Sequence, residues 1–223
     1  MSDPKPTLAI LGGSGDLGGG LAFRWARAGY PIIIGSRSAE KAEQAAAELA
    51  AKGLAGKVRG LDNEAAARAG DIVVLTVPFA NQAPTLEAIK AAVQGKILVD
   101  VTVPLVPPKV GTVQLPAGGS AGQIAQATLG EGVRVVSAFQ NVAAAHLEDP
   151  EHDPDCDVLV CGNDADACAA VLALVAAAGM KGWHAGPIAN SVVAEALTSV
   201  LITLNRRYKI PGAGFRITGS PQA

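Results

Sequence analysis

A glycine-rich turn near the start of the chain constrains the fold more than any other stretch. Residues 8–11 are wholly apolar, which is typical of a buried strand, and they lead directly into a run of glycines. Small and apolar residues then continue at a spacing compatible with a helix. Gly13, Gly15 and Gly18 match the G-x-G-x-x-G spacing of a dinucleotide-binding turn. In such a turn the glycines permit a tight bend, a close approach of backbone to a pyrophosphate, and close packing of the helix on the strand.

The helix that should follow this turn strengthens the interpretation. Its unpaired backbone N–H groups and the positive end of its dipole would face the turn and suit a phosphate. Glycine-rich turns also occur for structural reasons alone. The interpretation therefore depends on the residues at the end of the second strand.

The end of the second predicted strand indicates which dinucleotide would bind. In NAD-binding units an Asp or Glu about 20 residues beyond the glycines contacts the ribose 2′-hydroxyl. Here the strand at 31–34 is followed by Gly-Ser-Arg-Ser, without a carboxylate. The guanidinium of Arg37 and the hydroxyls of Ser36 and Ser38 suit phosphate oxygens, and Lys41 adds a cation four residues after Arg37. These residues predict a site for NADP(H); the alternative is that Arg37 and Lys41 are ordinary solvated charges at a helix start.

Apolar runs and helix-compatible stretches alternate along the rest of the chain. Further strands are predicted at 57–61, 71–78, 96–101, 133–138, 158–161 and 181–184. Helices are predicted to end near Ala28, to follow Pro78, and to span 39–52, 62–69, 120–129, 164–178 and 190–208. This alternation predicts an α/β fold, a doubly wound parallel sheet of the Rossmann type. We expect residues 1–144 to form an NADP-binding domain and 145–223 a smaller, α-rich C-terminal part that serves dimerisation and the substrate pocket.

Two segments are predicted at the edge of the sheet where the carboxyl ends of its strands meet. Ligands of open α/β sheets bind at this edge, so the residues that end or follow the strand at 71–78 are expected to line the cofactor: Val77, Pro78, Phe79 and Asn81. The strand at 96–101 leads into residues 102–120, where several prolines forbid a long helix. A loop of this length inside a compact domain is usually functional, and we expect it to cover a substrate.

Composition and charge argue against several other classes of protein. The formal net charge is −2 and no basic stripe is present, so nothing favours a nucleic acid or an anionic membrane as a partner. The apolar runs at 167–178 and 192–204 fall short of the ~20 residues that span a bilayer. The chain starts with MSDPKP, which lacks the apolar segment of a signal peptide, and a cytoplasmic location is expected.

Cysteine and histidine residues give little support for a metal or a nucleophilic centre. The chain has three cysteines, Cys156, Cys161 and Cys168, and no recognisable secretion signal. An odd number of cysteines in such a chain argues against a set of disulfide bonds, so they are expected to be free and buried. Segment 146–157 combines two histidines, a cysteine and carboxylates, but its spacing matches no zinc pattern and its prolines indicate an exposed loop. No Ser-His-Asp or Cys-His arrangement is recognisable, so we expect neither a metal nor a catalytic nucleophile.

Taken in order, these segments resemble one family, the NADPH-dependent reductases of the deazaflavin coenzyme F420. The resemblance covers nearly the whole chain and rests on LGGSGDLGGGLA, IIIGSRSAEKAE, LTVPFANQA, PLVPP, VVSAFQNVAA, DVLVCGNDADA, HAGPIANSVVAEALTSVLITLNRRY and PGAGFRITG. The glycine turn alone is common to many proteins, whereas this ordered set is much more specific.

The resemblance implies roles that spacing alone does not assign. It implies that NADP phosphates are held by Ser14, Gly15, Asp16, Leu17, Ser36, Arg37 and Lys41. It also implies that the segment around Phe79 and Asn81 and the segment from Gln140 to Ala144 face the nicotinamide. The pocket of the second substrate would be shaped by Phe139, Gln140 and Asn141. Archaeal members tend to carry a histidine where Gln140 stands, so the chain departs from the family pattern at the second substrate.

The resemblance also implies a reaction in which a hydride passes between NADP(H) and coenzyme F420. Both cofactors carry the chemistry, so the protein has only to stack two rings and exclude water, and no catalytic residue is expected. Two alternatives remain open: an NADPH-dependent reductase of flavin, a ferric chelate or a small imine or carbonyl compound, and a non-catalytic NADP-sensing protein. The apolar last helix at 190–208 suggests a homodimer.

Overall fold

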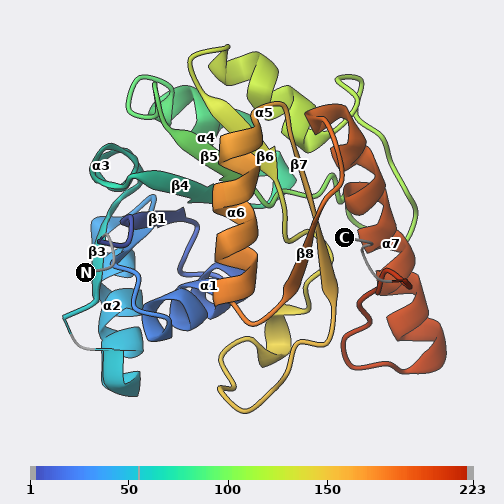
Figure 1. The fold of residues 1–223 in the computed structure, drawn as a ribbon, viewed down its shortest axis with the longest axis horizontal. Helices are drawn as coiled ribbons and strands as arrows, with labels where there is room; N and C mark the ends of the chain where they lie inside the picture. Colours follow the sequence, from blue (N-terminus) through green and yellow to red (C-terminus); the bar gives the residue numbers. More distant parts are fainter. Residues whose placement is uncertain (1–3, 55, 220–223) are drawn as a thin grey trace.

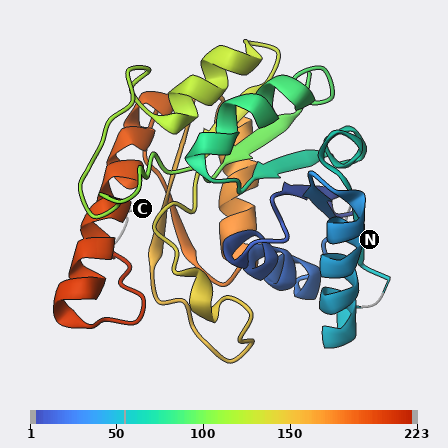
Figure 2. The same ribbon diagram turned by 180° about the vertical axis from the view of Figure 1, so that it is seen from behind.

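The computed structural model describes residues 4–54 and 56–219, so the outer ends of both predicted domains, including the first three residues of MSDPKP, lie outside the described residues. The described residues form an eight-stranded sheet with the order β3-β2-β1-β4-β5-β6-β7-β8 (Figures 1 and 2). The strands are β1 (Leu8–Leu11), β2 (Ile32–Ser36), β3 (Val58–Asp62), β4 (Ile72–Leu75), β5 (Ile97–Asp100), β6 (Arg134–Ser137), β7 (Asp157–Gly162) and β8 (Lys181–His184). Each lies where the hydrophobic pattern predicts a strand.

Seven α-helices lie between or beyond these strands in the described part of the chain. They are α1 (Asp16–Arg27), α2 (Ala39–Leu49), α3 (Asn63–Ala69), α4 (Phe79–Ile89), α5 (Ala121–Leu129), α6 (Ala165–Ala177) and α7 (Ser191–Tyr208). Short turns add η1 (Ala50–Leu54), η2 (Ala144–His146) and η3 (Ile188–Asn190). Four helices begin at a side chain that accepts a hydrogen bond from the N–H three residues later, which satisfies a backbone donor that a helix start leaves open: Ser38, Asp62, Ser120 and Asp164.

Strand pairing confirms the predicted fold class and adds one antiparallel junction. From β3 to β6 every neighbouring pair is parallel, and β1, β2, β4 and β5 are buried along their whole length. Parallel strands covered on both faces are expected to be apolar throughout, as these are. β7 then pairs antiparallel with β6, and β8 parallel with β7. The sheet therefore continues past residue 144, and the C-terminal part of the chain contributes strands as well as helices.

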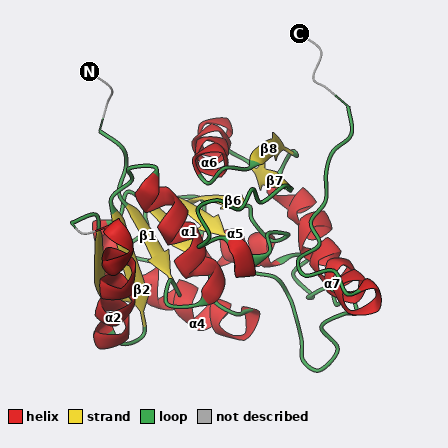
Figure 3. Cartoon of the chain, turned by 90° about the horizontal axis from the view of Figure 1, so that it is seen from below, coloured by secondary structure: helices red, strands yellow, loops and turns green. Residues whose placement is uncertain are grey.

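Helices cover both faces of the sheet, as a doubly wound fold requires. One apolar cluster joins the sheet to α1, α2 and α6, and a second joins its other face to α3, α4 and α5. Figure 3 shows α6 and α4 on opposite sides of the strands. Trp25 in α1 anchors the first cluster, because its ring meets Phe139 edge to face at 5.6 Å and its indole N–H donates to the Leu174 carbonyl of α6 at 2.8 Å.

Helix α7 lies at the end of the molecule opposite α2 (Figures 1 and 3). Together with η3 it forms a continuous stretch, Ile188–Tyr208, that is long and apolar enough by length and composition to cross a membrane, with a mean hydropathy of 1.4. The estimate from sequence that the apolar runs are too short was therefore wrong for this helix. A core helix of a soluble protein passes the same test, and the carboxylate of Glu195 in the second turn of α7 is buried against α5.

Candidate functional site

The predicted turn lies between β1 and β4, where the strand order reverses direction. The chain leaves β1 toward β2 on one side, while β4 begins the other half of the sheet. Crevices at such switch points are where open α/β sheets bind ligands. Gly12 forms the bend itself, with φ +82° and its N–H donating to the Gly35 carbonyl at 2.9 Å. The spacing rule assigned the tight bend to Gly13, but the left-handed residue that needs glycine is its neighbour.

The other glycines of the turn permit close packing. A β-carbon on Gly13 would lie 2.8 Å from the Ile10 carbonyl oxygen. One on Gly18 would lie 2.5 Å from the Thr76 hydroxyl and 2.8 Å from the α-carbon of Gly13. Helix α1 can therefore reach the ends of β1 and β4 only because these positions lack side chains.

The start of α1 is open for an anion. Gly15 is its N-terminal cap and provides no side-chain hydrogen bond, so the first N–H groups of the helix are not capped by a side chain. A β-carbon on Gly15 would meet only the Gly12 carbonyl, at 3.4 Å. Backbone donors and the helix dipole thus converge on a place that a phosphate can approach.

Two cations stand at the end of β2, where specificity for the adenosine ribose is decided. Arg37 and Lys41 are exposed, and neither forms an ion pair within residues 4–54 and 56–219. Ser38 caps α2 by accepting from the Lys41 N–H at 3.4 Å, which places Lys41 in the first turn of the helix. Ser36 is the last residue of β2 and is 8% exposed. Both cations are therefore available for an anionic ligand beside the glycine turn.

One cavity of about 680 Å³ joins the turn to this pair of cations. Most of the residues predicted for the nucleotide line it: Ser14, Gly15, Asp16, Leu17, Gly18, Ser36, Arg37, Ser38, Lys41, Val77, Pro78 and Asn81. Gly13 is not among the lining residues. Phe79, the half-buried first residue of α4, and Ala144, the first residue of η2, are not part of the lining.

Sequence reasoning missed four residues of the lining: Gly12, Asn63, Thr76 and Thr85. Thr76 follows β4 directly and donates to the Leu11 carbonyl at 2.9 Å, so it holds the ends of β1 and β4 together. Asn63 follows Asp62 at the end of β3, and Thr85 lies one helical turn beyond Asn81 and donates to its carbonyl at 2.7 Å. The signal for Asn63 was its place just past the strand predicted at 57–61, at the edge where ligands bind. Thr76 gave no such signal, because it lies within the strand predicted at 71–78, and only the observed β4 ends before it.

The cavity fits an NADP molecule by the chemistry of its donors. It offers an uncapped helix start for a pyrophosphate, two cations for a 2′-phosphate, and the mainly apolar wall of Val77 and Pro78 for a flat ring. No carboxylate stands between Gly35 and Ala39, where one would repel a 2′-phosphate.

The structure places the three residues predicted for the second-substrate pocket beyond the nucleotide cavity. Phe139 is 1% exposed, has φ +73°, and packs on Trp25. Gln140 donates to the Asp100 carbonyl at 2.9 Å and lies 2.8 Å from the Ser137 hydroxyl. Asn141 donates to the Ala194 carbonyl of α7 at 2.8 Å. These side chains join β5, β6 and α7 to one another.

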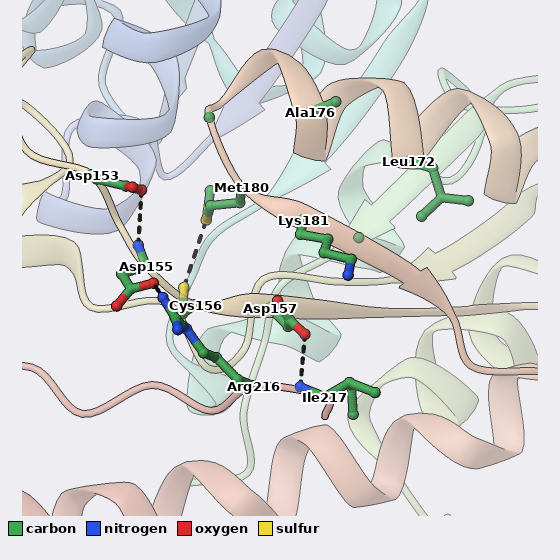
Figure 4. A pocket seen from close by; sticks show the side chains of 12 residues that line it. Asp153, Asp155, Cys156, Asp157, Leu172, Ala176, Met180, Lys181, Arg216 and Ile217 are labelled. Atoms are coloured by element: carbon green, nitrogen blue, oxygen red, sulfur yellow. Dashed lines mark hydrogen bonds and ion pairs between the residues drawn. The ribbon is translucent and has the colours of Figure 1, made fainter. Parts of the chain in front are cut away.

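A slightly larger cavity of about 750 Å³ lies between α6, β8 and the C-terminal segment (Figure 4). Its acidic residues already have partners: Asp155 pairs with Arg216, and Asp157 accepts from the Trp183 indole and the Ile217 N–H, each at 2.7 Å. Burial raises the pKa of Cys156 to about 11, so its thiol stays protonated. This cavity contains none of the predicted site residues and offers no helix start with cations beside it.

The three cysteines and segment 146–157 were the other candidate ligand groups in the sequence. All three cysteines are free and buried, as predicted. Among the described residues no group of three or more His, Cys, Asp and Glu side chains is arranged to hold a metal ion.

Comparison with known proteins identifies the family. The chain is 43% identical to an F420-dependent NADP reductase of Methanocaldococcus jannaschii, over 95% of this chain and 97% of the relative. It is 39% identical to the F420-dependent NADP reductase of Methanothermobacter marburgensis, over 96% of this chain and 99% of the relative. Residues 7–104 match the family described as NADP oxidoreductase, coenzyme F420-dependent. The chain belongs to the F420-dependent NADP reductases. It is an NADP-dependent oxidoreductase by this membership.

Solved structures support the same fold for this reductase. A protein of Arthrobacter sp. FB24, proposed to be an F420-dependent NADP reductase, superposes with a TM-score of 0.78 at 28% identity, over 95% of this chain and 99% of that one. An imine reductase of Myxococcus stipitatus superposes with a TM-score of 0.61 at 20% identity, over 92% of this chain and 62% of that one. The second likeness shows a shared fold alone.

Proposed function

We propose that this reductase transfers a hydride between NADP(H) and the deazaflavin coenzyme F420. The observation that carries the proposal is the cavity at the β1/β4 switch point, where an uncapped α1 start and the cations Arg37 and Lys41 face the same space. Family membership of the whole chain supports the pairing with a deazaflavin.

The chain's own task in this proposal is to bind and orient. The first turn of α1 holds the pyrophosphate, Ser36, Arg37 and Lys41 hold the 2′-phosphate, and Val77 and Pro78 form the wall along the nicotinamide. When bound, NADPH supplies the hydride, so the reaction needs no nucleophile from the protein. Gln140 and Asn141 shape the second-substrate side through their hydrogen bonds with α7, and Phe139 through its packing on Trp25 of α1. Residues 1–144 thus act as the NADP-binding part and 145–223 as the part that completes the pocket.

Stopped-flow mixing of the protein and NADPH with oxidised coenzyme F420 tests the proposal. We expect the deazaflavin absorbance to bleach rapidly, with FMN, a ferric chelate and a cyclic imine as parallel acceptors. NADPH binding with rapid reduction of one of those acceptors instead would replace the proposal by the corresponding reductase. NADPH binding without reduction of any acceptor would favour a non-catalytic NADP-binding protein.

We also propose that the reductase is a cytoplasmic homodimer whose subunits meet along α7, without membrane or nucleic-acid partners. Val193 and Val200 of α7 are 57% and 43% exposed and lie seven residues apart, which places them on one face of the helix. Sedimentation at micromolar concentration should give a dimer, and Val200→Glu should shift it toward monomer. A monomeric wild-type protein would contradict this part of the proposal.

A further inference from the structure

Two buried carboxylates lie outside the nucleotide cavity and have no part in the function proposed above. Asp100, the last residue of β5, is 0% exposed, and Glu195, in the second turn of α7, is 3% exposed. Carboxylates are rarely buried to this extent unless their oxygens are fully hydrogen-bonded. Their partners therefore indicate what the two groups hold in place.

Asp100 fixes the start of the 102–120 loop. Its Oδ1 accepts from the Thr102 N–H at 2.9 Å, and its Oδ2 accepts from the Gln82 carboxamide at 2.5 Å. The same Gln82 nitrogen donates to the Ala121 carbonyl at 2.9 Å. Gln82, on α4, therefore joins the strand end that leads into the loop to the residue that begins α5.

Glu195 fixes the other end of the same loop. Its Oε2 accepts from the Ala121 N–H at 2.7 Å and its Oε1 from the Gly122 N–H at 3.1 Å, so the carboxylate covers the start of α5. The Ser191 hydroxyl donates to Glu195 at 3.0 Å and lies 2.7 Å from the hydroxyl of Ser120, the last residue of the loop. The middle of the loop also meets α7, because Thr203 donates to the Gly111 carbonyl at 2.8 Å.

This network reaches the wall of the nucleotide cavity through α4. Gln82 follows Asn81, and Asn81 lines the cavity together with Pro78 and Thr85 of the same segment. The side chain of Gln82 is 1% exposed and is held by Asp100 and α5, which fixes the first turn of α4 in position. A displacement of α5 would therefore move the wall on the nicotinamide side and both ends of the loop together.

We propose that Glu195, with Asp100 and Gln82, is a positioning residue for the second substrate. Glu195 holds α5 and the 102–120 loop against the nicotinamide end of the cavity, so that the deazaflavin meets a preformed surface. The inference rests on the proposed function for the identity of that substrate. The adenosine end of the cavity, at Arg37 and Lys41, lies outside the network.

The surroundings of Glu195 explain why a glutamine would not replace it. Three donors face its two oxygens, namely the Ala121 and Gly122 N–H groups and the Ser191 hydroxyl. The titratable groups that interact with it are Asp100 and the Cys161 thiol of β7, and no cation is among the groups that shift its pKa. A glutamine in its place would turn an NH₂ group toward one of these donors and leave that donor without an acceptor.

Glu195→Gln tests the inference, with Glu87→Gln as a matched control that removes the same charge at an exposed position of α4. In the ligand-free variant we expect the amides of Thr102, Ala121 and Gly122 to exchange hydrogen roughly ten times faster, while those of β4 stay unchanged. In the enzyme assay the KM for coenzyme F420 should rise about 10-fold, with kcat changing less than about 3-fold and the Kd for NADPH less than about 2-fold. Glu87→Gln should change none of these quantities.

The outcomes separate this inference from the proposed function. Faster exchange with an unchanged KM for F420, or equal losses for F420 and NADPH, would overturn the positioning role. Should Glu195→Gln fail to fold, Ser191→Ala removes one of the three donors and should shift exchange and KM in the same direction by a smaller factor. A wild-type protein that binds NADPH but does not reduce F420 would instead contradict the proposed function, while the exchange data would still report on the network.

Discussion

The nucleotide cavity and the carboxylate network of Asp100 and Glu195 are built in different ways. The cavity takes its main features from short segments, the turn from Gly12 to Gly18 and the stretch from Ser36 to Lys41, and from the backbone as much as from side chains. The network joins residues as far apart as Glu195 and Ala121, through side chains that are almost wholly buried. One region is encoded locally, whereas the other exists only after the whole chain has folded.

This difference separates binding from stability. Arg37 and Lys41, the cations that would bind the nucleotide, are exposed. Their replacement should therefore alter the affinity for NADPH more than the free energy of unfolding. The residues of the network hold packed elements together, as do the adjacent Gln140, which donates to the Asp100 carbonyl, and Phe139, which packs on Trp25. We count these two residues with the second region, and replacement of any of its residues should alter folding first. Changing one region and measuring both properties tests this division.

The largest expected effect is that of Phe139→Ala on stability. The side chain is 1% exposed and packs edge to face on Trp25, so its removal leaves a cavity between β6 and α1. We expect the free energy of unfolding in urea to fall by about 4 kcal/mol, with the Kd for NADPH of the folded variant nearly unchanged. Phe79→Ala, the same change at a half-buried position, should cost much less stability. A large loss of NADPH affinity in folded Phe139→Ala would break the division.

The local encoding of the nucleotide region explains why the sequence predicts it well. Three short-range patterns predict it: the glycine spacing, the apolar run before the glycines and the absence of a carboxylate after β2. Each of them reflects a steric or electrostatic requirement of nucleotide binding. Strands and helix starts were predicted for the same reason, since caps such as Asp62 and Ser120 lie within three residues of the group they satisfy. The antiparallel direction of β7 was not predicted, because the direction of a strand depends on the path that the preceding loop takes across the sheet edge.

The second region could not be predicted from the sequence in the same way. Nothing near Glu195 in the sequence indicates that its carboxylate covers the start of a helix that lies 74 positions earlier. Phe139, Gln140 and Asn141 were identified by resemblance, as parts of a substrate pocket, and the spatial arrangement shows what their side chains hold. Apolar periodicity predicted α7 correctly, but it did not indicate which groups would bind the carboxylate of Glu195 within that helix.

The buried carboxylates predict a pH dependence of stability opposite to that of most acidic groups. Burial raises the pKa of Asp100 to about 6 and that of Glu195 to about 7. In the unfolded chain both would titrate near pH ~4, so between about pH 4 and 7 the folded chain binds more protons than the unfolded one. The pair therefore contributes stability that is present at about pH 5 and lost as the pH rises through about 7, by about 3 kcal/mol in total.

Urea unfolding at a series of pH values between about 5 and 7.5 measures this effect. The midpoint should fall as the pH rises, and Asp100→Asn should flatten the curve because one of the two titrating groups is gone. A stability that rises with pH over this range, in both proteins, would mean that the two carboxylates are ionised in the folded chain throughout. The affinity for NADPH is the contrasting measurement. Neither Asp100 nor Glu195 lines the nucleotide cavity, so Asp100→Asn should leave that affinity nearly unchanged.

The smallest effect on stability, and the sharpest test of the cavity itself, is that of Arg37→Ala. Arg37 is exposed and forms no ion pair with another described residue, so its loss should leave the free energy of unfolding nearly unchanged. If its guanidinium holds the 2′-phosphate, affinity for NADPH should fall roughly 30- to 100-fold, about 2–3 kcal/mol, as expected for charge-assisted hydrogen bonds. Affinity for NADH should change less than about 3-fold, because NADH lacks that phosphate. Fluorescence titration of both nucleotides decides between this outcome and equal losses, which would place the 2′-phosphate elsewhere and leave Lys41 and Ser36 as the residues to replace next.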